Sequence, residues 1–272
     1  MQTSGIDKNV TVNGVTICYD DFGIGDTSMI FVHGFPFDKS SWKPQMDFFK
    51  NTHRVISFDH RGFGQSTTAE ENVSINLLAD DLVKLMDILS INKAILCGLS
   101  MGGYVVLNAV SRYPERIEAL ILSDTQCIAD TQEVKEKRNK IIQLIESGGL
   151  QVFVDEFVNS IFSKQTLNTN HDLINSIKKA IQSTKEQTII STLRALSARW
   201  ETCSSLKEIN IPTLILCGKE DKITTPAQSE FLQQNIKNSL LHIITNAGHL
   251  SNLEQPEEFN KQMSDFISGF MK

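Results

Sequence analysis

Short apolar segments alternate with amphipathic ones along most of the chain. Six runs are largely apolar and too short for a typical helix, at Met29–Val32, Val55–Phe58, Ala94–Cys97, Ala119–Leu122, Thr213–Cys217 and Leu241–Ile244. Runs of this kind are typical of strands buried on both faces of a parallel sheet. A hairpin is predicted before them at Val10–Val12 and Val15–Tyr19, because Asn13-Gly14 supplies the positive φ angles of a tight turn.

Between these runs, apolar residues recur at three- and four-residue spacing, which predicts helices with one buried face. Such stripes occupy Leu78–Leu89, Val105–Tyr113 and the segment from Phe259 onward. The alternation of strands and helices predicts right-handed crossovers and an open, mostly parallel α/β sheet with helices on both faces.

Residues 125–205 break the alternation, because they show helical patterns and no convincing strand. One apolar stripe there runs through Ile189, Leu193, Leu196 and Trp200. We therefore expect a helical cap insertion at 125–205 that covers one edge of the sheet. It would divide the core into a first part at 1–124 and a second part at 206–272.

Composition sets limits on what the protein binds. The chain has 272 residues, enough for one large domain or a domain with an insertion, and a net charge of −6 with a pI near 5.6. An acidic surface argues against a nucleic-acid partner, which needs clustered Lys and Arg. No apolar run approaches the roughly 20 residues that span a bilayer, and Met1–Val10 lacks the features of a signal peptide.

The cysteines give no sign of a metal or redox site. Three of the five, Cys18, Cys97 and Cys217, lie in apolar runs and are expected to be buried free thiols. No CxxC pair occurs, so a zinc or redox centre is not expected. The simplest setting for such a chain is the reducing cytoplasm.

The sharpest motif is Gly98-Leu99-Ser100-Met101-Gly102. It directly follows the predicted strand Ala94–Cys97 and directly precedes a helical stripe, which is the strand–turn–helix setting of a G-x-S-x-G nucleophile elbow. Glycines on both sides permit a turn sharp enough to expose the hydroxyl of Ser100. We predict that Ser100 is a catalytic nucleophile.

A serine hydroxyl needs a base to take its proton. His249 follows the run Leu241–Ile244 and therefore lies at the carboxyl edge of the sheet, as Ser100 does. His33 also follows a strand, but its Gly34-Phe35-Pro36 context suits a backbone role, and His60 lies in a turn. We predict that His249 is the base.

The base needs an acid that fixes its tautomer and stabilises the imidazolium. Asp221 follows the strand Thr213–Cys217 and gives the chain order Ser, Asp, His that is known for one fold. Glu220 is adjacent but would point differently. Asp124, after the strand Ala119–Leu122, is a rival that could reach the same histidine from the neighbouring strand.

Acyl transfer also needs hydrogen-bond donors for the developing oxyanion. The backbone N–H of Met101, directly after the nucleophile, is the first candidate. The second is the N–H of Phe35, in the loop after Met29–Val32, since Pro36 has no N–H and Gly34 lets the backbone bend close.

Taken together, these motifs resemble those of the α/β-hydrolase superfamily over nearly the whole chain outside the insertion. The resemblance rests on the blocks His33–Pro36, Asp59–Ser66, Gly98–Gly103, Gly218–Asp221 and Gly248–Pro256. It implies an eight-stranded sheet and an enzyme like the small carboxylesterases, 3-oxoadipate enol-lactonases and cofactor-free haloperoxidases. Position 100 is serine, so the aspartyl-intermediate chemistry of dehalogenases and epoxide hydrolases is disfavoured. The polar block that includes Asp59 and Arg61 is expected to be structural.

The expected activity is hydrolysis of a small ester or lactone without a cofactor or metal. Enol-lactonase or perhydrolase activity on the same triad is the alternative, and a small-molecule receptor is a third possibility. Substrate walls are expected from Phe35, Met101, Trp200 and Leu250, and less strongly from Phe157 and Phe162. Binding a dicarboxylate lactone would need a cation, for which Arg194 and Arg199 are weak candidates.

Overall fold

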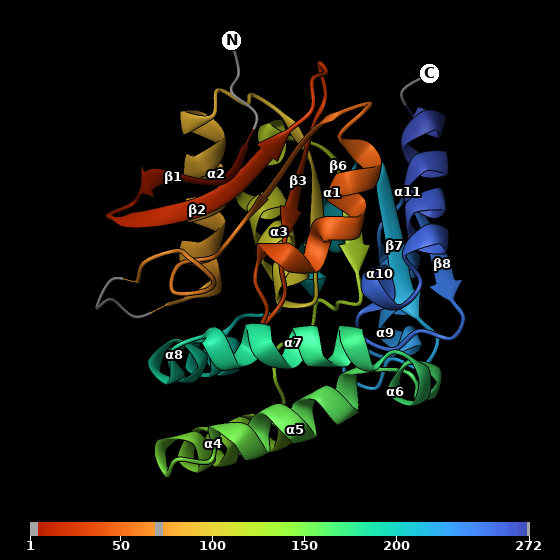
Figure 1. The fold of residues 1–272 in the computed structure, drawn as a ribbon. Coiled ribbons are helices and arrows are strands. Elements are labelled where there is room, and N and C mark those ends of the chain that lie inside the picture. Colours follow the sequence, from red (N-terminus) through yellow and green to blue (C-terminus); the bar gives the residue numbers. More distant parts are fainter. Residues whose placement is uncertain (1–4, 69–72, 271–272) are drawn as a thin grey trace.

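A computed structural model describes residues 5–68 and 73–270, so the expectation for Met1–Val10 falls partly outside the described residues. Within these residues, eight strands form one sheet in the order β1-β2-β4-β3-β5-β6-β7-β8 (Figure 1). Their bounds are β1 Gly5–Val12, β2 Val15–Phe22, β3 Ser28–Val32, β4 Arg54–Phe58, β5 Ala94–Leu99, β6 Ile117–Ser123, β7 Thr213–Gly218 and β8 Ser239–Ile244.

The first two strands form the predicted hairpin, with Asn13 and Gly14 at φ angles of 43° and 81°. β2 pairs antiparallel with β4, and all later pairings are parallel. Each apolar run falls inside a strand, as predicted. The last strand differs from expectation because β8 is an edge strand and leaves Leu240 61% exposed.

Helices cover both faces of the sheet. α1 (Lys43–Phe49) packs against α10 (Ser251–Glu254) and α11 (Pro256–Phe270), and α2 (Ile75–Ile88) packs against α3 (Met101–Arg112). α9 (Pro226–Asn235) packs against β7 and β8. Short 3-10 helices occupy Lys39–Trp42, Pro114–Arg116 and Cys203–Glu208.

Five α-helices lie between β6 and β7, and we call them the cap. They are α4 (Gln132–Glu146), α5 (Leu150–Ile161), α6 (Lys164–Thr169), α7 (His171–Ser183) and α8 (Glu186–Ala198). Figure 1 shows them gathered beyond one end of the strands, the end from which β5 runs into α3. Among the described residues, no helix is both long enough and apolar enough to cross a lipid bilayer.

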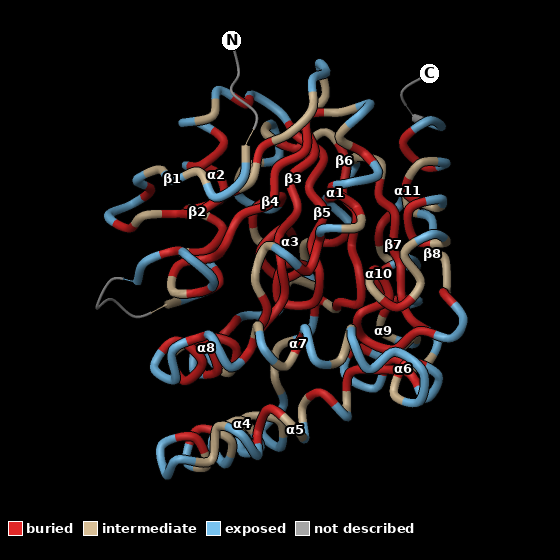
Figure 2. Tube along the Cα trace, in the orientation of Figure 1, coloured by how far each residue is buried: buried red, intermediate tan, exposed pale blue. Residues whose placement is uncertain are grey.

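The core follows the central strands, which are buried along nearly their whole length (Figure 2). Cys18, Cys97 and Cys217 are buried free thiols, as expected. The other two cysteines, Cys127 and Cys203, form a disulfide that joins the chain entering the cap to the chain leaving it. Because disulfides are rare in reducing compartments, this bond weakens the argument from cysteines for a cytoplasmic setting, which stays a prediction.

Candidate active site

The turn between β5 and α3 holds Ser100 in a conformation that its neighbours dictate. Ser100 has φ 52°, in the left-handed region, and its N–H donates to the carbonyl of Ser123 at 2.9 Å. A Cβ at Gly98 would lie 2.5 Å from the carbonyl oxygen of Gly102, and one at Gly102 would lie 2.0 Å from that of Val32. Only glycine fits at either position, so the strained serine is locked between strand and helix.

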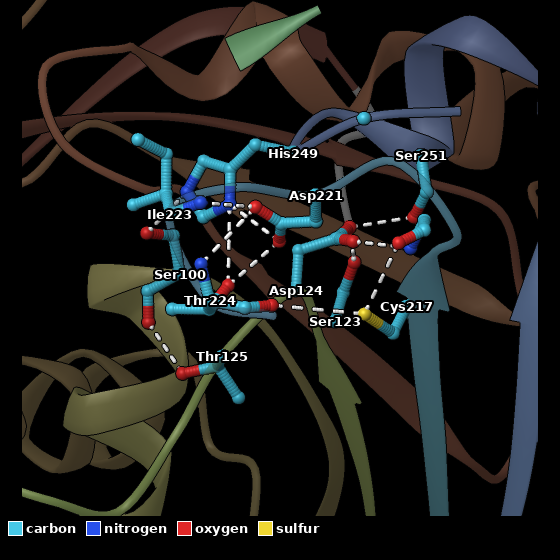
Figure 3. Close-up of polar contacts among 12 residues, drawn as sticks. Ser100, Ser123, Asp124, Thr125, Cys217, Asp221, Ile223, Thr224, His249 and Ser251 are labelled. Carbon is cyan, nitrogen blue, oxygen red and sulfur yellow. Dashed lines mark hydrogen bonds and ion pairs between the residues drawn. The ribbon is translucent and has the colours of Figure 1, made fainter. Parts of the chain in front are cut away.

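Three side chains from distant parts of the chain meet beside this turn (Figure 3). His249 Nε2 lies 2.8 Å from Ser100 Oγ, and His249 Nδ1 lies 2.8 Å from Asp221 Oδ2. An ionised carboxylate can only accept, so Nδ1 carries the proton and Nε2 is free to accept from the serine hydroxyl. In an arrangement of this kind, a histidine can take the proton of a serine hydroxyl.

Asp221 is held in place by its own loop. Its Oδ1 accepts from the backbone N–H groups of Ile223 and Thr224, and its Oδ2 accepts from the Thr224 hydroxyl at 2.8 Å. Burial raises the pKa of Asp221, but the charge of His249 and these hydrogen bonds outweigh it and leave the pKa below its usual value. The carboxylate of Asp221 is therefore ionised over the whole pH range in which His249 gains or loses its proton.

The surroundings of His249 favour its protonated form. Burial alone would lower the pKa of His249, but the Asp221 carboxylate, with further contributions from Asp124 and Glu254, raises it above the usual value. An imidazole with a raised pKa is a stronger base, which suits it to take the serine proton.

The loop that carries His249 is tied to the cap. The N–H of His249 donates to the carbonyl of Ile161, at the end of α5. Glu254 accepts from the N–H of Gly248 at 2.7 Å and from that of Ser163 at 2.9 Å, so one carboxylate joins the base loop to the chain between α5 and α6. The role of Glu254 could not be predicted from the sequence, because it depends on where the cap lies.

Of the two rival acids, neither is hydrogen-bonded to His249. Glu220 accepts from the N–H of Lys164 in the cap, so it points away as expected. Asp124 accepts from the N–H of Gly218 and from the hydroxyls of Ser123 and Ser251. Burial, reinforced by the charge of Asp221, raises the pKa of Asp124 to about 7. Figure 3 shows Asp124 beside Asp221, on the side away from Ser100.

The loop after β3 lies against the nucleophile. A Cβ at Gly34 would lie 3.0 Å from the carbonyl oxygen of Leu99 and 3.2 Å from Ser100 Cβ, so glycine brings the backbone of Phe35 close to the hydroxyl. Met101 is the first residue of α3, where an N–H has no partner within the helix. Both predicted oxyanion donors therefore belong to residues beside Ser100.

The neighbouring histidines have structural roles. His33 Nδ1 lies 2.8 Å from the carbonyl oxygen of Gly34, and His33 Nε2 accepts from the N–H of His60. In the following block, Arg61 forms a buried ion pair with Asp81. Asp59 accepts from two backbone N–H groups. These contacts fix the loops on either side of the site, as expected.

A cavity of about 80 Å³ opens beside Ser100 and His249. From the core it is lined by Phe35, Met101, Tyr104 and Ile223. From the cap it is lined by Arg138, Ile141, Phe153, Phe157, Leu193 and Leu196. The cap thus supplies half of the lining residues, and five of its six are apolar.

Some sequence-predicted wall residues lie elsewhere. Phe35, Met101 and Phe157 line the cavity, but Trp200 does not, because α8 ends at Ala198 and the chain then turns extended. Trp200 is 86% exposed and lines a separate hollow between α3 and the end of the cap. Leu250 and Phe162 are buried in the packing and do not line the described cavity.

The arginine candidates are also placed differently. Arg194 is on the surface, paired with Glu146, and Arg199 is buried against Asp130. The arginine that does line the cavity is Arg138, which was not among the arginines predicted to bind a substrate carboxylate.

One cluster has the composition of a metal site. Ligand atoms of Asp124, Cys217 and Asp221 lie within 4.8 Å of one another. All four oxygens of the two carboxylates already accept hydrogen bonds, and burial raises the pKa of the Cys217 thiol. A cation there would compete with these hydrogen bonds, so the cluster suits hydrogen bonding better than metal binding.

Comparisons with known proteins agree with this geometry. Residues 27–256 match the family model described as alpha/beta hydrolase fold. The chain is 32% identical over 240 residues, 88% of both chains, to "3-oxoadipate enol-lactonase 1" of Acinetobacter baylyi (strain ATCC 33305 / BD413 / ADP1). Its structure resembles that of a thermophilic esterase from Thermogutta terrifontis (malate bound), with TM-score 0.92, 30% identity and coverage of 96% and 98%. It also resembles the enol-lactonase from Burkholderia xenovorans LB400, with TM-score 0.90, 27% identity and coverage of 96% and 100%.

Proposed function

The chain belongs to the α/β-hydrolase family, as its motifs implied, and on that premise we propose that it is a serine hydrolase of small carboxylic esters. The proposal rests on the two 2.8 Å contacts that link Ser100, His249 and Asp221 into one chain of hydrogen bonds. Relatives named as an esterase and as enol-lactonases support the reaction class.

In the first half of the proposed reaction, Ser100 Oγ attacks the ester carbonyl while His249 Nε2 takes its proton. The charge that develops on the carbonyl oxygen is held by the backbone N–H groups of Phe35 and Met101. Such donors act strongly because they are fixed before the reaction begins. His249 then donates its proton to the departing alcohol, which leaves an acyl group on Ser100.

In the second half, water replaces the alcohol. His249 takes a proton from the water, the hydroxide attacks the acyl carbonyl, and the acid leaves as Ser100 recovers its proton. Asp221 stays ionised throughout and stabilises the imidazolium formed in each half. The reaction uses no cofactor or metal.

Hydrolysis of an enol-lactone is a second candidate, which the relatives named as enol-lactonases favour. A lactone is an internal ester, so the same groups act and the leaving oxygen stays attached to the acyl group. If hydrogen peroxide replaced water, the acyl-enzyme would instead yield a peracid. Assays of lactone opening and of peracetic acid formation from acetate and peroxide therefore separate these activities.

Labelling by a fluorophosphonate, together with turnover of p-nitrophenyl acetate, tests the proposal. Wild type should be labelled at Ser100, and Ser100→Ala should lose both labelling and turnover by several orders of magnitude while keeping its circular dichroism spectrum. Ser111→Ala is the matched control, because Ser111 is an exposed serine on α3, the helix that follows Ser100. This variant should behave as wild type. Substantial hydrolysis by folded Ser100→Ala would refute the assignment.

A further inference from the structure

One cation stands out in the cavity beside Ser100. Arg138, on α4, shares this cavity with mostly apolar side chains such as Ile141, Phe153 and Leu193. Its side chain is 19% exposed, so it is largely removed from water. Electrostatic attraction is stronger in such surroundings than at an open surface.

The charge of Arg138 is only partly balanced. Its Nε donates to Asp130 Oδ2 at 2.5 Å and its Nη2 to Asp130 Oδ1 at 3.4 Å, but Oδ1 also accepts from Arg199 Nη1 at 2.6 Å. Burial raises the pKa of Asp130, yet the two guanidinium groups outweigh it and lower the pKa, so the carboxylate is charged. Two positive groups sharing one negative group leave a net charge of about +1 at the cavity wall.

The cluster is also rigid. Arg199 is buried and donates to the carbonyl oxygens of Leu196 and Ile128, and its guanidinium stacks 4.3 Å from the ring centre of Tyr104. Asp130 is thereby fixed, and it orients Arg138 through Nε and Nη2. Among the described residues, Arg138 Nη1 donates to no acceptor, which leaves its N–H groups for a ligand in the cavity.

We propose that Arg138 binds a carboxylate on the substrate, so that the preferred substrates are short esters or lactones that carry a free carboxylate. This inference rests on the proposed hydrolase function. A planar guanidinium edge matches the two oxygens of a carboxylate. The cavity beside Ser100 is small, about 80 Å³, which favours substrates with only a few atoms between the ester and the carboxylate.

Two esters that differ only at the far end test this directly. Monomethyl succinate carries a carboxylate where methyl butyrate carries a methyl group, and a pH-stat follows the hydrolysis of both. Wild type should show the higher kcat/KM for monomethyl succinate. Arg138→Gln should lower the ratio of the two kcat/KM values by about 10- to 100-fold, the usual range for loss of a charge-assisted hydrogen bond. Arg138→Lys should recover part of the ratio.

Arg194→Gln is the matched control, because Arg194 is a cap arginine on the surface paired with Glu146. It should leave the ratio unchanged. A general loss of folding would lower both rates together and not their ratio. An unchanged ratio in Arg138→Gln, with Ser100-dependent turnover of both esters, would overturn the role of Arg138 and leave the proposed function standing.

Binding provides a readout that does not need turnover. Ser100→Ala should bind succinate in a calorimetric titration, and Ser100→Ala with Arg138→Gln should bind it at least tenfold more weakly. Equal affinity in the two would contradict the proposal. If wild type hydrolysed neither ester but succinate binding still depended on Arg138, the hydrolase proposal would fail on these esters while the carboxylate site remained.

Discussion

Replacing Asp221 or Asp124 by asparagine separates the triad acid from its rival. Both carboxylates are buried and lie within 4.8 Å of each other, so proximity alone does not choose between them. Their contacts do, because only Asp221 reaches His249 Nδ1. In Asp221→Asn, an amide NH₂ placed at that contact donates to Nδ1 and moves the imidazole proton to Nε2. The base then points a hydrogen at Ser100 and cannot take its proton.

The expected loss is large at position 221. A base held in the wrong tautomer lowers kcat by about 10⁴-fold, which corresponds to about 5 kcal/mol in the activation free energy. Asp124→Asn differs, because its amide oxygen can still accept from Gly218 and its NH₂ can donate to the hydroxyl oxygens of Ser123 and Ser251. That substitution removes only a charge, and we expect a loss of about tenfold or less.

Initial rates of p-nitrophenyl acetate hydrolysis at pH 8 measure both effects, with thermal melts to show that each variant is folded. The reverse ranking, with Asp124→Asn the more damaging in a folded protein, would move the acid to the strand beside Asp221. Equal losses of about 10⁴-fold would show that the two carboxylates act as one unit. That result would contradict the assignment of Asp221 alone as the acid that orients His249.

Three further predictions concern the surroundings of the triad. The kcat/KM should rise with pH as His249 loses its proton, with a midpoint above 6.5, and Asp124→Asn should lower that midpoint because Asp124 helps to raise the pKa of His249. Replacing both Cys127 and Cys203 by serine opens a loop of sequence separation 76 and should lower the free energy of unfolding by about 4 kcal/mol, and thermal melts of the wild type with dithiothreitol should show the same shift. Glu254→Gln sets an amide NH₂ against the N–H of Gly248 or Ser163, so kcat and the melting temperature should both fall, whereas Glu146→Gln on the surface should change neither.

The strands and the nucleophile turn could be predicted from the sequence because their signals are local. A short apolar run needs no knowledge of its neighbours to indicate a buried strand. Likewise, Gly98 and Gly102 indicate a tight turn because any side chain there meets backbone atoms. The meeting of Ser100 and His249 follows from these local signals, since both come after parallel strands and the carboxyl ends of such strands share one edge.

The cavity wall could not be predicted in the same way. Its residues depend on where each cap helix ends and which face it turns inward. The stripe through Leu193 and Leu196 suggested that Trp200 continued it, but α8 stops two residues earlier and Arg199 takes the buried place instead. Arg138 shares a helix face with Ile141 and Ile145 in the sequence pattern, but the charged run Glu133–Lys140 around it is typical of a solvated face, so its place in the cavity could not be predicted.

The cap therefore makes two kinds of contact with the candidate site. It lines the cavity through α4, α5 and α8, and it also holds the base, because Ile161 accepts from the N–H of His249 and Ser163 shares Glu254 with Gly248. A shift of the end of α5 would displace the imidazole that must lie 2.8 Å from Ser100. In the proposed mechanism, substrate size and proton transfer are thus coupled through one helix, so a cap residue that never touches the substrate would still change the rate of the chemical step.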